Sequence, residues 1–315
     1  MVAELLLALA RCNLAASLAI LAVFPLRAPL RRWFGAQHAY AAWLIVPLAA
    51  AGSLMPTDFA AGATGPIEQT SHYMLAWLSA DGRVGAITVV WLAGVLAAIA
   101  IVARRHAGFC GAMKAGRAGP AATGVIERRL VLPADFEARF TEDERRLVRA
   151  HEQAHIDRQD TRYNAAAVVA SWACWFNPLL HLAIQAMRRD QELACDATVL
   201  DRLPGARRLY AETLLRTHQD VAAPALGCQW RSGPSHPLVA RIRWLGSRSP
   251  SRTRREVGAA FLLATWAMAF GAAWAAQPPA RLPETQTVVL IDLAPPDAAT
   301  VQQGAAVYRA IETRP

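Results

Sequence analysis

The stretch His151-Glu152-Gln153-Ala154-His155 contains two histidines four residues apart, with a glutamate directly after the first. In a helix, residues at i and i+4 lie on the same face, so both imidazoles can reach one metal ion. Glu152 then projects beside that ion, where it can take a proton from an attacking water. The pattern predicts a zinc site with its own general base. Two surface histidines on a charged helix are the alternative.

The residues around this motif predict a helix over 142–160. Thr141 followed by Glu144 forms a capping box, and the acidic first turn complements the helix dipole. Leu147 falls on the same stripe as the two histidines, which favours a face that points inward.

The composition is that of a membrane protein. The 315 residues are 54% hydrophobic with a mean hydropathy of +0.21, too apolar for an ordinary soluble enzyme. Segments 39–55, 85–103 and 258–276 have about the length that a bilayer core requires. Segment 2–25 is interrupted by polar residues but is interpreted as a further span. A signal peptide is the alternative, although no basic cluster precedes the apolar run and no small-residue cleavage site ends it cleanly.

Charge predicts the orientation. Arginines are concentrated in segments 26–38 and 104–257, whereas the loop 56–84 has three acidic residues and one arginine. The positive-inside rule therefore places the two basic segments in the cytoplasm, and this loop outside. Retained basic loops explain the net charge of +9 without a direct nucleic-acid partner, and a basic patch for DNA is the weaker alternative.

The predicted fold class is therefore mainly α: a multi-pass inner (plasma) membrane protein with four transmembrane helices and a small β element. Its parts are the membrane region 1–103, a cytoplasmic domain 104–257, the fourth span 258–276 and a short tail 277–315. The N-terminus and this tail are expected outside. Membrane lipid is an expected partner, and a homodimer is compatible with this organisation.

The apolar segment 164–187 tests this topology. If it crossed the membrane, the arginine-rich residues 188–255 would lie outside, against the charge rule. We therefore predict two helices joined at Phe176-Asn177-Pro178, with Pro178 at the first helical position of the second.

This interpretation keeps Glu192 on the same side of the membrane as the histidines. Two imidazoles and one carboxylate leave a fourth zinc position for water, as in hydrolytic sites. Asp196, one turn further on, can accept the ring N–H of a ligand histidine. A solvated charged face is the alternative for both acids. Cys195 is a rival ligand that would give a closed, structural site.

At this point the sequence resembles the BlaR/MecR-type membrane metallopeptidases, the antirepressor and sensor-transducer family within the gluzincin zinc proteases. The matching segments are HEQAHIDRQD (151–160), WFNPLLHL (175–182), RRDQELACD (188–196), HPLVARIRWL (236–245), GPAATGVIERRLVLPADF (119–136) and RRWFGAQHAYAAWLIVPLA (31–49). The combined pattern is much more specific than the two histidines and the glutamate alone.

The resemblance implies a gluzincin-like protease domain with zinc as cofactor, held between a third and a fourth span. It implies a cytoplasmic regulatory protein, such as a transcriptional repressor, as the substrate. It also implies the zinc ligands His151, His155 and Glu192, the catalytic base Glu152 and the second acidic residue Asp196. His236 and Arg241 match a further family motif. A role for His236 at the oxyanion competes with helix capping.

Other functions remain open at this stage. The chain could be a non-proteolytic membrane signal transducer with structural zinc, or a general membrane quality-control protease. Residues 277–315 are too few for a penicillin-binding sensor domain and contain no Ser-x-x-Lys signature, so we expect no such domain in this chain. Residues 124–132 are expected to form a small strand pair that aligns a peptide by edge pairing, or else an ordinary hairpin.

Overall fold

The computed structural model describes residues 2–55, 83–217, 228–229, 236–247 and 249–277. Over these residues the chain is mainly helical, which confirms the predicted class. The expectations for the loop 56–84 and the tail 277–315 concern residues that lie almost wholly outside the described ones, so both stay predictions.

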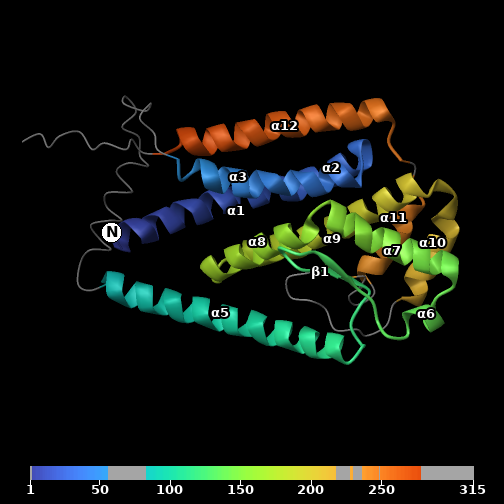
Figure 1. The fold of residues 1–315 in the computed structure, drawn as a ribbon. Coiled ribbons are helices and arrows are strands. Elements are labelled where there is room, and N and C mark those ends of the chain that lie inside the picture. Colours follow the sequence, from blue (N-terminus) through green and yellow to red (C-terminus); the bar gives the residue numbers. More distant parts are fainter. Residues whose placement is uncertain (1, 56–82, 218–227, 230–235, 248, 278–315) are drawn as a thin grey trace, which may run out of the picture.

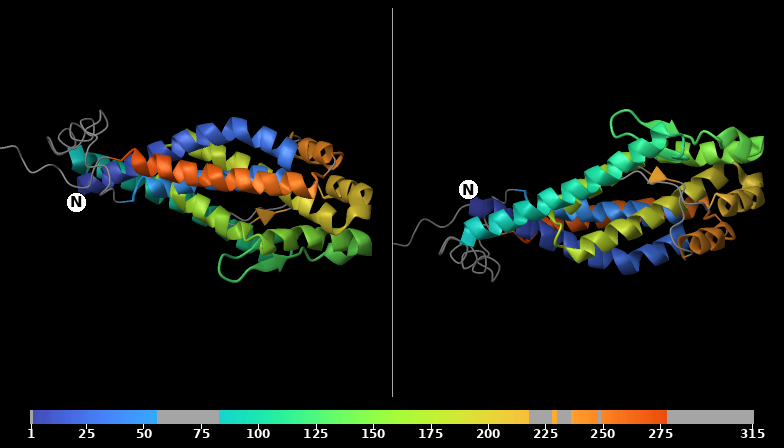
Figure 2. Two further views of the ribbon diagram at one scale, coloured as in Figure 1. Left: turned by 90° about the horizontal axis from the view of Figure 1, so that it is seen from above. Right: turned by 90° about the horizontal axis from the view of Figure 1, so that it is seen from below.

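Three helices of the described residues are long and apolar enough to cross a membrane: α1 (Val2–Phe34), α5 (Arg83–Lys114) and α12 (Arg252–Ala275). They extend along the long axis of the molecule, while shorter helices gather at the end away from the N-terminus (Figures 1 and 2). In α5 the apolar side chains are largely exposed, as suits a helix that faces lipid. Each of these helices is longer than the span predicted within it.

The predicted span 39–55 has a different form. It is divided among α2 (Ala36–Ala41), a 3-10 turn (Ala42–Leu44) and α3 (Ile45–Gly52). It is therefore not one of the three long helices, and a fourth span stays a prediction. α3 packs against both α1 and α12, and α2 packs against α9.

The predicted helix pair is confirmed in α8 (Asp160–Ala173) and α9 (Pro178–Arg202). Asn177 caps α9 by accepting from the main-chain N–H groups of Leu179 and Leu180, and Pro178 begins the helix. The Asn177 amide also donates to Asn13 and Ser17 of α1, at 2.7 and 3.0 Å. The turn that joins α8 and α9, here called the tip of the helix pair, therefore lies against α1 away from either end of that helix.

The motif helix α7 (Glu142–Asp157) has the predicted capping box of Thr141 and Glu144. It ends before residue 160, so the predicted C-terminal boundary is wrong. Gln159 takes the left-handed conformation, with a φ of 60°, and Asp160 starts α8 instead. This sharp turn brings the first residue of α8 back beneath the end of α7.

Short elements complete the end of the molecule around α7. They are α6 (Phe136–Arg139), a 3-10 turn (Pro204–Ala206), α10 (Arg207–Arg216) and α11 (His236–Leu245). Their apolar side chains form a core with α7 and the second half of α9, in which Tyr210, Phe136 and Leu214 are fully or almost fully buried.

A small antiparallel sheet lies against α7. Its strands are β1 (Ala121–Thr123), β2 (Arg129–Val131) and β3 (Cys228–Gln229), in the order β2-β1-β3. The strand pair starts earlier than predicted, because Gly124 has a φ of 91° and belongs to the turn. Within the described residues β1 is paired on both sides, so it presents no open edge to a peptide.

Candidate metal centre

The predicted ligands converge from two helices. His151 and His155 project from α7, and Glu192 projects from α9. The Nε2 atoms of the two histidines are 3.2 Å apart. Nε2 of His151 lies 3.4 Å from Glu192 Oε2, and Nε2 of His155 lies 3.5 Å from Glu192 Oε1. Zinc bonds of about 2.0–2.1 Å at tetrahedral angles place ligand atoms about 3.3–3.4 Å apart. The three residues therefore have the spacing that one such ion requires.

Hydrogen bonds on the far side of each imidazole set its orientation. The Nδ1–H of His155 donates to Asp160 Oδ2 at 2.8 Å. The Nδ1–H of His151 donates at 2.8 Å to the hydroxyl of Tyr210, which in turn donates to Asp196 at 2.7 Å. With Nδ1 protonated in both rings, Nε2 carries the lone pair that a metal needs. Burial, followed by the neighbouring His155 charge, lowers the pKa of His151 well below its usual value, which keeps that ring neutral.

Asp196 was predicted to accept directly from a ligand histidine, whereas the structure connects it to His151 through the Tyr210 hydroxyl. Its nearer oxygen is 3.5 Å from His151 Nδ1, and Tyr210 lies between them in the hydrogen-bond chain. The main partner of Asp196 is Arg241, which donates to it from Nε and Nη2 at 2.9 and 2.6 Å. Arg241 Nη1 also lies 3.0 Å from Glu192 Oε2, in an ion pair rather than a hydrogen bond. Arg241 therefore joins α11 to α9, the helix that carries the third candidate ligand.

Glu152 is fully buried, and neither of its carboxylate oxygens makes a hydrogen bond of good geometry among the described residues, although the main chain of Ala122 in β1 lies close enough to oppose the rise in its pKa. Burial raises its pKa to about 7, with a further upward contribution from Glu192 and an opposing one from His155. An unpaired buried carboxylate is costly unless it serves a bound group. Together with the donor set of two imidazoles and one carboxylate, this unsatisfied group fits a hydrolytic metal site.

A second cluster of possible ligands consists of His155, Asp160 and Cys195. It lies on the Nδ1 side of the same ring, with Cys195 Sγ 3.2 Å from His155 Nδ1. Arg158 donates to this sulfur at 3.4 Å, and burial raises the pKa of the thiol to about 12. Cys195 thus faces Nδ1 of His155, whereas Glu192 faces Nε2 of the same ring. Cys195 is therefore not part of the group formed by His151, His155 and Glu192.

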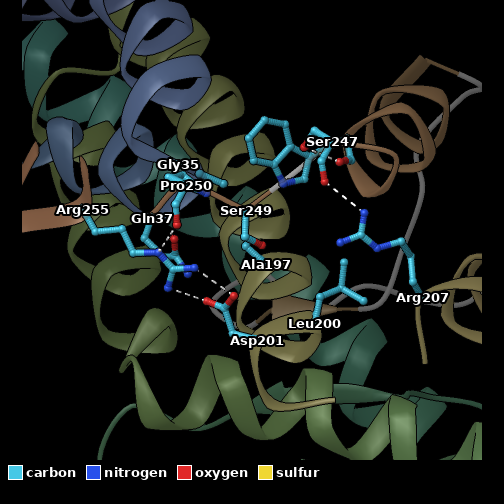
Figure 3. A pocket seen from close by; sticks show the side chains of 12 residues that line it. Gly35, Gln37, Ala197, Leu200, Asp201, Arg207, Ser247, Ser249, Pro250 and Arg255 are labelled. Carbon is cyan, nitrogen blue, oxygen red and sulfur yellow. Dashed lines mark hydrogen bonds and ion pairs between the residues drawn. The ribbon is translucent and has the colours of Figure 1, made fainter. Parts of the chain in front are cut away.

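A small cavity elsewhere lies between the start of α2, the end of α9 and the loop before α12 (Figure 3). Asp201 at its edge is paired with Arg255, at 2.8 and 3.0 Å, and Arg207 donates to the main-chain oxygen of Ser247. None of the three candidate ligands is among the residues that line it, so the cavity is distinct from the metal centre.

Sequence reasoning missed two residues at the centre, Asp160 and Tyr210. Asp160 lies only five residues after His155, but its role depends on the turn at Gln159. Tyr210 comes from α10 and carries no motif signal. His236 is the first residue of α11, and its side chain lies outside the described residues. Arg241, a tentative candidate, lies in direct contact with Glu192 and Asp196.

Comparison with known proteins identifies the class. The family model described as BlaR1 peptidase M56 matches residues 7–109 and 112–245, so the chain belongs to this peptidase family. The chain is also 33% identical over 98 residues to the regulatory protein BlaR1 of Bacillus licheniformis. That match covers 31% of this chain and 16% of the relative, so the chain spans only a small part of the length of this relative. No solved structure matches the chain.

Proposed function

We propose that the chain is an integral-membrane zinc metalloendopeptidase. The observation that carries the proposal is the convergence of His151, His155 and Glu192 at zinc-ligand spacing beside the unpaired carboxylate of Glu152. Membership in a peptidase family supports the reaction type.

His151, His155 and Glu192 would hold the metal, which when bound supplies Lewis-acid activation of a water and of the scissile carbonyl. Glu152 takes a proton from the attacking water and delivers it to the leaving amine. Its raised pKa suits both steps, because the carboxylate is a usable base and its conjugate acid a usable donor near neutral pH. Asp160 and Tyr210 orient the two imidazoles, and Arg241 holds the Glu192 and Asp196 carboxylates in place.

The proposed topology has four spans, with residues 104–257 on the cytoplasmic side and the N-terminus and tail outside. The concentration of arginines in segments 26–38 and 104–257 and the three long apolar helices support it. The tip of the α8–α9 pair contacts Asn13 of α1 and Trp91 of α5, so in this topology it enters the membrane from the cytoplasmic side. The proposed substrate is a cytoplasmic regulatory protein, such as a transcriptional repressor. The name of the Bacillus relative, a regulatory protein, supports a signalling role over general quality control.

A comparison of Glu152→Gln with Glu142→Gln tests the proposal. Glu142 is exposed in the first turn of the same helix, so it controls for the chemical change itself. Zinc is measured by elemental analysis of the purified proteins, and new protein N-termini are measured in cells that carry each form. We expect zinc in both variants and cleavage only with Glu142→Gln, whereas His155→Ala should lose the metal.

The outcomes separate the alternatives. Undiminished cleavage by Glu152→Gln would remove Glu152 from the catalytic role. Bound zinc without any cleavage, and signalling unaffected by Glu152→Gln, would indicate a structural metal. New N-termini in many unrelated proteins would indicate a quality-control protease. New N-termini in a single regulatory protein would indicate the proposed function.

A further inference from the structure

The hydroxyl of Tyr40, at the end of α2, lies at the junction of two hydrogen-bond chains. It donates its single proton to Asp160 Oδ1 at 3.0 Å, because the Asp160 carboxylate can only accept. It accepts from Gln191 Nε2 at 2.8 Å. Asp160 accepts from the ligand His155, and Gln191 directly precedes the ligand Glu192. One hydroxyl from the N-terminal region therefore touches both the residue that accepts from His155 and the residue that directly precedes Glu192.

The surroundings hold this contact in a fixed geometry. Asp160 and Gln191 are buried, and Asn164 donates to Gln191 Oε1 at 3.1 Å, which orients the amide. The Arg158 guanidinium lies 4.5 Å from the centre of the Tyr40 ring. A buried network of this kind specifies one arrangement of its members.

A second contact fixes α9 to the same N-terminal elements. Asp190, fully buried, accepts from the Trp43 indole at 2.9 Å and is paired with Arg27 and Arg31 of α1, at 3.2 and 3.3 Å. Asp190 precedes Gln191 in the sequence, so the N-terminal elements hold α9 immediately before its metal ligand. The position of α2 relative to α9 is thereby coupled to the geometry of the site.

We infer that Tyr40 is a positioning residue for the metal centre. It orients the imidazole of His155 through Asp160. This inference rests on the proposed function, since it presumes that His155 is a metal ligand. Groups that orient metal ligands typically contribute 10- to 100-fold to metal affinity. Tyr40 reaches His155 through one additional hydrogen bond, so its effect on metal affinity should lie at the low end of that range.

The test is a double-mutant cycle on zinc affinity, measured by chelator competition with the full-length protein in detergent. We expect Asp160→Asn to weaken zinc binding by about 10- to 100-fold and Tyr40→Phe by about 10-fold. If Tyr40 acts through Asp160, adding Tyr40→Phe to Asp160→Asn should change the affinity by less than about twofold. Tyr163→Phe is the matched control, because Tyr163 is exposed and contacts the Tyr40 ring edge-on.

Two results would overturn the inference while leaving the proposed function intact. One is wild-type zinc affinity in Tyr40→Phe. The other is a full additional loss in the double variant, which would indicate a structural role independent of Asp160. Thermal unfolding of each variant checks that the fold is retained. Absence of zinc binding by the wild-type chain would overturn the proposed function and this inference together.

Discussion

The guanidinium of Arg241 forms two hydrogen bonds with the carboxylate of Asp196, of 2.9 and 2.6 Å, and both side chains are almost completely buried. The third nitrogen of the same group lies 3.0 Å from the candidate ligand Glu192. A single cation from α11 thus forms ion pairs with two acids on α9. Breaking a buried pair is costly because the remaining charges cannot be solvated.

Arg241→Ala should therefore destabilise the protein by about 3–5 kcal/mol and weaken zinc binding. Arg241→Lys should lie between this variant and the wild type, since lysine keeps the charge but not the planar two-point geometry. Arg243→Ala is the control, because Arg243 is exposed on the same helix. Thermal unfolding in detergent and zinc competition measure the effects. Equal behaviour of the variants at 241 and 243 would contradict the structural role.

Tyr210→Phe should weaken zinc binding by about 10-fold, because it removes the acceptor of the His151 Nδ1–H. Asp196 is 3.5 Å from that nitrogen, too far to replace Tyr210 without movement. Chelator competition measures the affinity, with Tyr163→Phe as control. An unchanged affinity would show that the Tyr210 hydroxyl does not orient His151.

The pKa of Glu152 predicts how the stability of the metal-free protein depends on pH. The folded state raises this pKa from 4.5 to about 7, so folding favours the protonated carboxyl. Below about pH 4.5 the carboxyl is protonated in both the folded and the unfolded state, so its burial costs no charge. As the pH rises from 4.5 through 7, the free energy of unfolding decreases, because the unfolded state loses this proton more readily than the folded state. Above that pH the charged carboxylate destabilises the fold by up to about 3 kcal/mol.

Glu152→Gln, which stays neutral, should unfold at nearly the wild-type temperature at pH 4.5 in the presence of chelator. It should become the more stable of the two between pH 5 and 8. Glu142→Gln should show no such divergence. A difference that stays constant across this range would contradict a raised pKa.

Gly94 in α5 should not tolerate a side chain. A Cβ at this position would overlap the Trp175 indole at the tip of the α8–α9 pair. We expect Gly94→Ala to cost about 1–3 kcal/mol by overpacking. Gly111→Ala in the same helix is the control, because nothing lies within 4 Å of its added Cβ. Thermal unfolding compares the two variants, and equal unfolding temperatures would show that the tip does not pack on α5 in this way.

Local sequence patterns located the starts of α7 and α9 and the candidate ligands His151 and His155, whereas Glu192 was selected from the predicted topology and the family resemblance. The capping box at Thr141 and the cap at Asn177-Pro178 are short-range signals, and they located the starts of α7 and α9. The four-residue spacing of His151 and His155 likewise follows from the helix repeat. The apolar composition indicated the three long apolar helices, whose ends extend beyond most of the apolar windows.

Only the tertiary structure decided which groups support those ligands. The left-handed turn at Gln159 places Asp160 under His155, and no local pattern predicts that conformation in a glutamine. Tyr210, Arg241 and Tyr40 reach the centre from three other helices, so their roles depend on packing between elements distant in the chain. A sequence motif can specify the side chains on one face of one helix. The partners of that face are determined by how the helices pack together.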